Sequence, residues 1–134
     1  MTKLFNDISI VGGLIGGFLC SWLGGWDVLL KALTALIVLD YITGVLKSIV
    51  HKTLSSSVGF KGLIRKMTIY IVIATAVIIQ DVIGGAIPLR ETAIMFFLCN
   101  EAISLLENSS EFVPIPEKLK DTLIQLREKN KGDK

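Results

Sequence analysis

The chain has 134 residues, of which 51% are hydrophobic and 19% charged, and its formal net charge is +2. A soluble domain of this length would keep more charge on its surface. Residues 8–26 and 67–80 contain no charged side chain at all. This layout excludes an ordinary soluble domain and indicates a protein that lies in a membrane.

The apolar stretches predict an all-α integral membrane protein made of helical hairpins. A helix of about 20 residues crosses the hydrocarbon core of a bilayer. Stretches of suitable length lie at approximately residues 8–25, 28–50, 63–82 and 91–107. We therefore predict four spanning helices within a transmembrane domain of residues 1–108. A three-span arrangement, with the first helix only at the interface, stays open.

Small residues recur every four positions along the first predicted helix. One row is Gly12, Gly16, Cys20 and Gly24, and the adjacent row is Gly13, Gly17, Ser21 and Gly25. Such rows let two helix backbones approach closely. They predict packing against the second helix, across the tight turn Trp26-Asp27, or association between copies of the chain, or flexibility of the helix itself.

The second predicted helix carries Asp40 near its middle. A charge at this depth costs from ~2.5 to more than 10 kcal/mol, so the carboxyl is either protonated or paired with polar groups of another helix. Gly44 and Lys47 follow on the same face, and Lys47 can extend its ammonium to the membrane surface. We expect the partners of Asp40 to come from the fourth helix.

The fourth predicted helix has a polar strip formed by Asn100, Glu101 and Ser104. Polar side chains of this kind can join neighbouring helices through hydrogen bonds. They can also line water in an assembled oligomer. Both interpretations stay open from the sequence.

The connection between the second and third predicted helices is basic and holds no acid. Its charged residues are Lys52, Lys61, Arg65 and Lys66. Positive residues gather on the cytoplasmic side of membrane proteins, and they attract anionic lipid. We therefore predict that this connection and both termini are cytoplasmic.

The tail of residues 109–134 is predicted to be cytoplasmic and to contain an amphipathic helix at about 117–129. Its apolar positions are Leu119, Leu123 and Leu126, at a spacing that places them on one helix face. Pro116 suits the start of a helix, and Arg127 and Lys129 suit its end.

Motifs of catalysis are missing. The sequence has one histidine, no glycine-rich phosphate loop and no metal-ligand spacing. We therefore predict no enzymatic activity, no cofactor and no bound metal. The basic connection also lacks the aromatic side chains of a nucleic-acid surface, so no nucleic-acid partner is predicted.

Several short motifs together resemble the toxin-secretion/phage-lysis holin family. They are Asp40-Tyr41-Ile42-Thr43-Gly44 with Lys47, then Leu54-Ser55-Ser56-Ser57, Gly59, Gly62 and Arg65-Lys66, and finally Asn100-Glu101, Ser104, Glu107-Asn108, Pro116 and Leu119. The resemblance covers roughly residues 28–126.

The resemblance implies a small phage or prophage protein of the bacterial plasma membrane. Such a protein forms homo-oligomers and opens lesions through which an endolysin reaches the cell wall, or a toxin leaves the cell. Two other classes stay open: a small ion-conducting channel or transporter subunit that uses Asp40 and Glu101, and a structural membrane scaffold.

Overall fold

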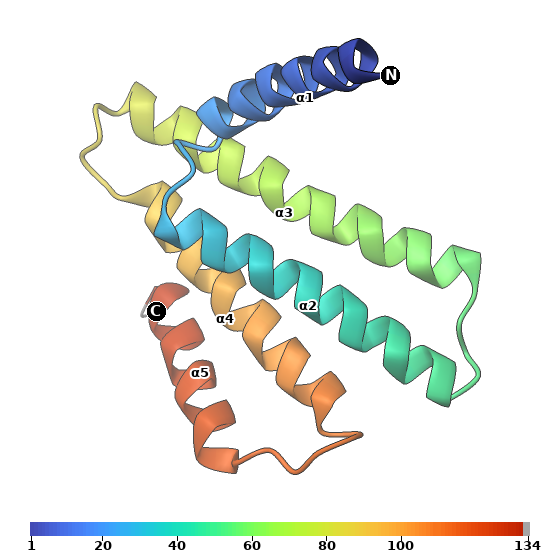
Figure 1. Ribbon diagram of the computed structural model, residues 1–134. Helices are drawn as coiled ribbons and strands as arrows, with labels where there is room; N and C mark the ends of the chain where they lie inside the picture. The colour runs from blue at the N-terminus through green and yellow to red at the C-terminus, as the bar shows by residue number, and fades with distance from the viewer. Residues whose placement is uncertain (133–134) are drawn as a thin grey trace.

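The computed structural model describes residues 1–132, which form five α-helices. They are α1 (Thr2–Trp22), α2 (Val28–Val50), α3 (Ser56–Val82), α4 (Leu89–Ser109) and α5 (Glu117–Asn130). Figure 1 shows them coloured in chain order. The all-α prediction is confirmed, and the predicted bounds of the second helix match α2.

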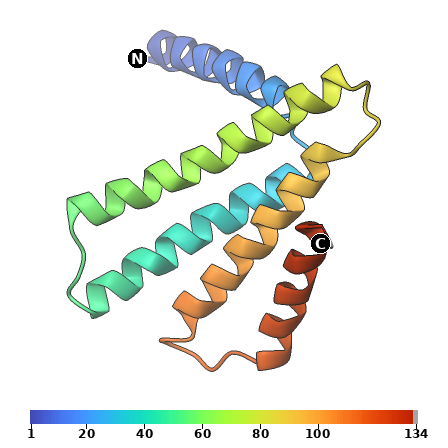
Figure 2. The same cartoon turned by 180° about the vertical axis from the view of Figure 1, so that it is seen from behind.

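The body of the molecule is made by α2, α3 and α4, and α5 lies back along α4 (Figure 2). Its core is a cluster of Leu33, Ile37, Ile69, Ile73 and Ile94. One side of each helix in the body contributes to this cluster, while large apolar side chains elsewhere stay exposed. In a bilayer, lipid would cover those exposed side chains, and close van der Waals packing would hold the body together.

The third helix begins at Ser56, well before the predicted residue 63. The Ser55 hydroxyl explains this, because it accepts a hydrogen bond from the backbone N–H of Val58 at 3.2 Å. Such an N-cap satisfies a donor that a starting helix leaves free. As a result Lys61, Arg65 and Lys66 lie on α3, and the predicted long basic connection is wrong for these three residues.

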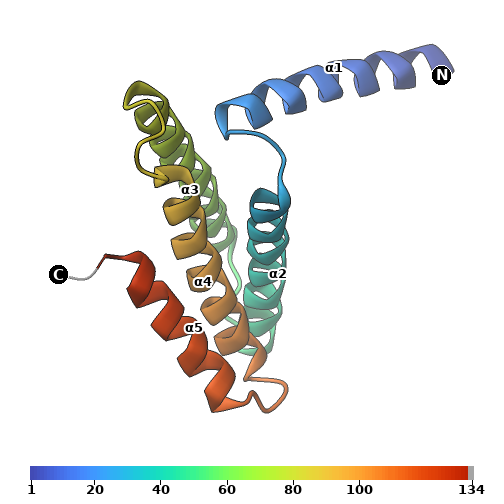
Figure 3. The same cartoon turned by 90° about the vertical axis from the view of Figure 1, so that its left-hand side faces the viewer.

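The first helix does not pack against the second. α1 ends at Trp22, before the predicted residue 25, because Gly24 and Gly25 adopt left-handed backbone angles (φ +80° and +104°). The chain then turns, and α1 leaves the body at a steep angle (Figure 3). Among residues 1–132, α1 and α2 share no helix contact. The predicted hairpin of these two helices, and packing of the glycine rows within one chain, are therefore wrong.

The glycine rows are consequently shorter than predicted. Gly24 and Gly25 belong to the turn, and Ser21 donates its hydroxyl to the carbonyl of Phe18 within α1. At Gly12, Gly13, Gly16 and Gly17, an added Cβ would meet no other part of the described chain within 4 Å. No residue of α1 is buried.

The fifth helix has the predicted extent but uses a different face. Its half-buried side chains are Lys120, Leu123, Ile124, Arg127 and Asn130. Leu119 and Leu126, which were predicted to share the packed face with Leu123, are 47% and 40% exposed. Polar pairs with α4, described below, hold α5 in this rotation.

Within the described residues, α1, α2 and α3 are long and apolar enough to cross a membrane by length and composition. α4 (predicted as 91–107) has 21 residues but carries Arg90, Glu91, Glu101 and Glu107. A fourth span formed by α4 therefore stays a prediction. The chain is a multi-pass membrane protein by the character of its apolar helices.

Candidate functional site

Two buried carboxylates and a half-buried ammonium meet between the helices of the body. Asp40 comes from α2, Lys66 from α3 and Glu101 from α4. The Lys66 ammonium donates to Asp40 Oδ2 at 2.6 Å and to Glu101 Oε2 at 2.5 Å. The Lys66 side chain is 12% exposed and both carboxylate side chains are 9% exposed. We call Asp40, Lys66 and Glu101 the charge triad.

The charge triad lies near half the length of each helix. At a rise of 1.5 Å per residue, Asp40 is about 15 Å from the end of α2 at Val50, and Lys66 is about 15 Å from the start of α3 at Ser56. Glu101 is about 12 Å from the end of α4 at Ser109. All three distances are measured from the same end of the body (Figure 1). The triad therefore lies near the middle of the three helices that form the body.

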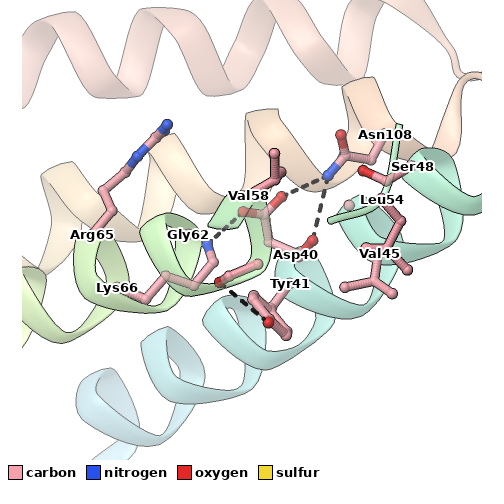
Figure 4. A pocket seen from close by; sticks show the side chains of 12 residues that line it. Asp40, Tyr41, Val45, Ser48, Leu54, Val58, Gly62, Arg65, Lys66 and Asn108 are labelled. Carbon is pink, nitrogen blue, oxygen red and sulfur yellow. Dashed lines mark hydrogen bonds and ion pairs between the residues drawn. The ribbon is translucent and has the colours of Figure 1, made fainter. Parts of the chain in front are cut away.

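Asp40 has a second partner beyond the triad, as Figure 4 shows. Asn108 donates through its side-chain amide to Asp40 Oδ1 at 3.0 Å. The same amide lies 3.3 Å from the Thr43 hydroxyl. Gly44 lies beside this amide, and a Cβ added there would make an ordinary van der Waals contact of 3.6 Å with the Asn108 amide nitrogen. A cleft of about 190 Å³ borders Asp40 here.

The triad combines two acids with one base. Removing such charges from water is costly, and only close pairing with further hydrogen bonds offsets that cost. Here each carboxylate contacts the ammonium directly, and Asp40 gains the Asn108 amide as well. This arrangement favours a structural role, because each carboxylate already gives one of its two oxygens to the Lys66 ammonium.

The prediction that Asp40 pairs with polar groups of the fourth helix is confirmed, because Asn108 of α4 donates directly to Asp40. Glu101 of α4 is linked to Asp40 only through Lys66, which donates to both carboxylates. Ser104 borders the same cavity as the triad. Asn100 also borders this cavity, and its side-chain oxygen accepts from Arg127 of α5 at 3.2 Å. The polar strip of α4 is thus divided between the body and α5.

Sequence reasoning missed Lys66 as the partner because Lys66 was assigned to the basic connection, with its ammonium at the membrane surface. Lys66 precedes the core residues Ile69 and Ile73 by three and seven positions, so it shares their helix face. That spacing was visible in the sequence. Of the other predicted basic residues, Lys52, Lys61 and Arg65 are exposed.

Lys47 lies in the last turn of α2 and takes part in a cluster at the surface of the molecule. Its ammonium is 3.6 Å from Glu111, which follows α4, and His51 Nε2 is 3.1 Å from the same carboxylate. The hydrogen bond with His51 lowers the pKa of Glu111, and the charges of His51 and Lys47 act in the same direction. This cluster joins the end of α2 to the connection before α5.

A second buried charge, Arg90, fastens the turn between α1 and α2. Its guanidinium donates to the carbonyl oxygens of Leu23 (2.5 Å) and Gly25 (3.1 Å), and to both carboxylate oxygens of Asp27 (2.7 and 3.1 Å). Arg90 is 4% exposed. We call these contacts the Arg90 clamp. Asp27 also caps α2 by accepting from the backbone N–H of Leu30.

A side chain at Gly24 would disturb the Arg90 clamp directly. An added Cβ there would lie 2.5 Å from Arg90 Nε and would also require a left-handed backbone. We expect Gly24→Ala to destabilise the turn by about 1–3 kcal/mol, measured as a lower midpoint of thermal unfolding in detergent. Gly25→Ala is the matched control, since it has the same backbone strain (φ +104°) but open space around its Cβ. Equal effects of the two changes would contradict a contact with Arg90.

Comparison with known proteins places these features in a family. The model of the bacteriophage holin family matches residues 17–128. An uncharacterized 14.9 kDa protein from the nagH 3′ region of Clostridium perfringens is 41% identical over 116 residues, covering 84% of this chain and 88% of that protein. An uncharacterized protein of Listeria innocua is 40% identical over 133 residues, covering 98% and 92%.

A phage protein is among the relatives. A probable holin of Bacillus phage phi105 is 32% identical over 95 residues, which is 70% of each chain. No solved structure matches the chain. The family match includes α2, α3, α4 and nearly all of α5, and thus both the charge triad and the Arg90 clamp. The chain belongs to the bacteriophage holin family.

Proposed function

We propose that this chain oligomerises in the bacterial plasma membrane and opens lesions through which an endolysin, or a toxin, leaves the cytoplasm. The holin family consists of membrane proteins that are not enzymes, and the chain is a member of it. The finer steps of assembly, lesion formation and cargo release are what we propose here for this chain.

The observation that carries the proposal is that the glycine positions of α1 meet no other part of the described chain, although α1 touches α3 elsewhere. Four glycines occur within α1, and each costs roughly 0.5–1 kcal/mol of helix stability relative to alanine. Nothing else in the described chain approaches their Cβ positions within 4 Å. A helix surrounded only by lipid would gain nothing from such ridges, whereas a helix that packs on another copy gains close backbone contact. The glycine rows therefore support assembly between chains.

We also propose an orientation. Basic residues gather toward the end of the body that holds the α2–α3 connection: Lys47 is half-buried, and Lys52, Lys61 and Arg65 are exposed. Positive side chains favour the cytoplasmic side and anionic lipid headgroups. We therefore place this end, and both termini, at the cytoplasm. Lys66 was predicted to attract anionic lipid with the other basic residues, but its ammonium is paired with Asp40 and Glu101 in the charge triad.

The test is expression of the chain together with a cytoplasmic endolysin in a bacterial host. We expect abrupt lysis, because a lesion passes a folded enzyme. An ion channel would instead depolarise the cells and leave the endolysin inside. The triad favours the lesion over that alternative, since Asp40 and Glu101 each give one carboxylate oxygen to Lys66 and the ammonium offsets their charge. Depolarisation without lysis would overturn the proposal.

Replacing Gly13 and Gly17 by leucine tests assembly through α1. We expect fewer high-order species after chemical crosslinking in membranes, because leucine would keep two helix backbones apart. The fold of the single chain should not change, since both positions are open. Val11→Leu with Ile15→Leu is the matched control, because it places the same side chains on the opposite face of α1. An unchanged ladder of oligomers in the glycine variant would show that another surface drives assembly.

A further inference from the structure

We propose that the side of the molecule formed by α4 and α5 is the water-facing wall of the assembled lesion, and that α5 docks along α4 only when water reaches the middle of the membrane. The inference rests on the proposed function. It gives a role to α5, which contributes no residue to the charge triad or to the Arg90 clamp.

Polar contacts hold α5 along α4 over more than half of its length. Near the connection between the helices, Lys120 lies 3.1 Å from the Glu107 carboxylate. Further along, Arg127 donates to Asn100 at 3.2 Å. Beyond the end of α5, the Lys131 ammonium lies 5.9 Å from the centre of the Phe96 ring. Figure 3 shows α5 beside α4 and on the side away from α2.

These contacts place the charged side chain of Arg127 level with the charge triad along the α4 axis. Asn100 is the neighbour of Glu101 and lies about 14 Å from Ser109 along the α4 axis. The exposed face of the docked α5 carries Asp121, Gln125 and Glu128. Lipid tails against this face would surround charged side chains with hydrocarbon, which is strongly unfavourable. The docked α5 therefore requires water beside it.

The rest of the chain is suited to lipid and not to water. α1, α2 and α3 are apolar enough to face lipid, and their exposed side chains include Leu14, Phe18, Ile42 and Ile71. The molecule thus has one side suited to lipid and one suited to water. A ring of copies that points its α4–α5 sides inward would satisfy both requirements at once.

A single chain in an intact bilayer has no water at this depth. Residues 110–116 join α4 to α5, so α5 can instead lie on the cytoplasmic membrane surface. Leu119 and Leu126, exposed in the docked form, would then enter the interface, as the apolar face of an amphipathic helix does. Docking of α5 is therefore coupled to the opening of the lesion.

Crosslinking between α4 and α5 tests this coupling in cells. Phe96→Cys and Asn130→Cys, which line one cavity between α4 and α5, place a pair of thiols, the mid-membrane pair, beyond Asn100 and keep the Arg127–Asn100 bond, in a full-length chain with Cys20→Ala and Cys99→Ala. A short membrane-permeant bismaleimide is added before lysis and again at its onset. We expect the crosslinked fraction to rise by about tenfold or more, because hydrocarbon excludes the docked helix until water enters.

The pair Glu107→Cys and Lys120→Cys is the matched control near the cytoplasmic surface, where docking needs no lesion, and its crosslinking should change little. Equally strong crosslinking of the mid-membrane pair in intact cells would overturn the proposal, and so would its absence after lysis. A failure to lyse would contradict the proposed function instead, while weak mid-membrane crosslinking in those intact cells would still agree with this inference.

The timing of lysis in a single-substitution variant gives a second test, because a docked α5 that stabilises the lesion and one that closes it predict opposite changes. Arg127→Leu removes the bond to Asn100 and should delay lysis if docking stabilises the open state. If α5 were a cover that keeps the lesion closed, the same change would advance lysis. Lys129→Leu is the control, because Lys129 is exposed on α5. Earlier lysis for the Arg127 variant alone would contradict the proposal.

Discussion

Lys66→Met is expected to destabilise the fold by about 3–5 kcal/mol, the cost of breaking a buried ion pair by removing one partner. The substitution keeps the length and apolar stem of the side chain but leaves Asp40 and Glu101 facing each other without the ammonium that lies 2.6 and 2.5 Å from them. We expect a much lower midpoint of thermal unfolding in detergent and loss of lysis activity.

Lys61→Met provides the matched control on the same helix, since Lys61 is exposed and should contribute little. A triple change, Asp40→Leu, Lys66→Met and Glu101→Leu, removes the whole charge triad. It should recover most of the lost stability, because apolar replacement of a complete buried ionic group is often neutral or stabilising. If the triple variant is as unstable as the single one, the effect comes from packing and not from unpaired charge.

Arg90→Met is expected to release the turn between α1 and α2. The substitution removes the donors to Leu23, Gly25 and Asp27 and leaves two carbonyl groups without their partner. We expect a loss of about 2–4 kcal/mol and faster proteolysis between Trp22 and Val28. Lys31→Met, on the exposed side of α2, is the control. Unchanged proteolysis in the Arg90 variant would show that the turn holds without the clamp.

The clamp also has a predicted pH dependence. The hydrogen bond from Arg90 lowers the pKa of Asp27 from 3.8 to about 2, and the cap on Leu30 acts in the same direction. Because the pKa is lower in the folded state, this stabilisation is present above pH ~4 and is lost as the pH falls towards ~2. We expect the wild-type unfolding midpoint to decrease over that window, and the Arg90→Met variant to lose part of this decrease.

The sequence predicts this structure well where helix periodicity decides it. The bounds of α2 follow from its apolar length, and α5 begins where Pro116 and Glu117 indicate. The need of Asp40 for a partner follows from the cost of its burial. These features depend on neighbouring residues in the chain, so local pattern is enough to find them.

The partners themselves depend on which helix faces meet, and periodicity does not determine that. Asp27 and Arg90 are 63 positions apart in sequence, and nothing in either local pattern indicates the other. The direction of α1 was missed for the same reason: two glycines near its end were interpreted as members of a packing ridge, whereas they form a turn that Arg90 holds. Lys66 alone was within reach of sequence reasoning, through its spacing from Ile69.

The charge triad restricts how this protein can change shape. A slide of one helix by a single residue would move its charged group by about 1.5 Å along the axis, enough to break contacts of 2.5–2.6 Å. α2, α3 and α4 are thus fixed in axial register with one another, and rearrangement by sliding or rotating them separately is prevented. Under the proposals above, these three helices would act as one unit, with α1 available for contact between copies and α5 for contact with water.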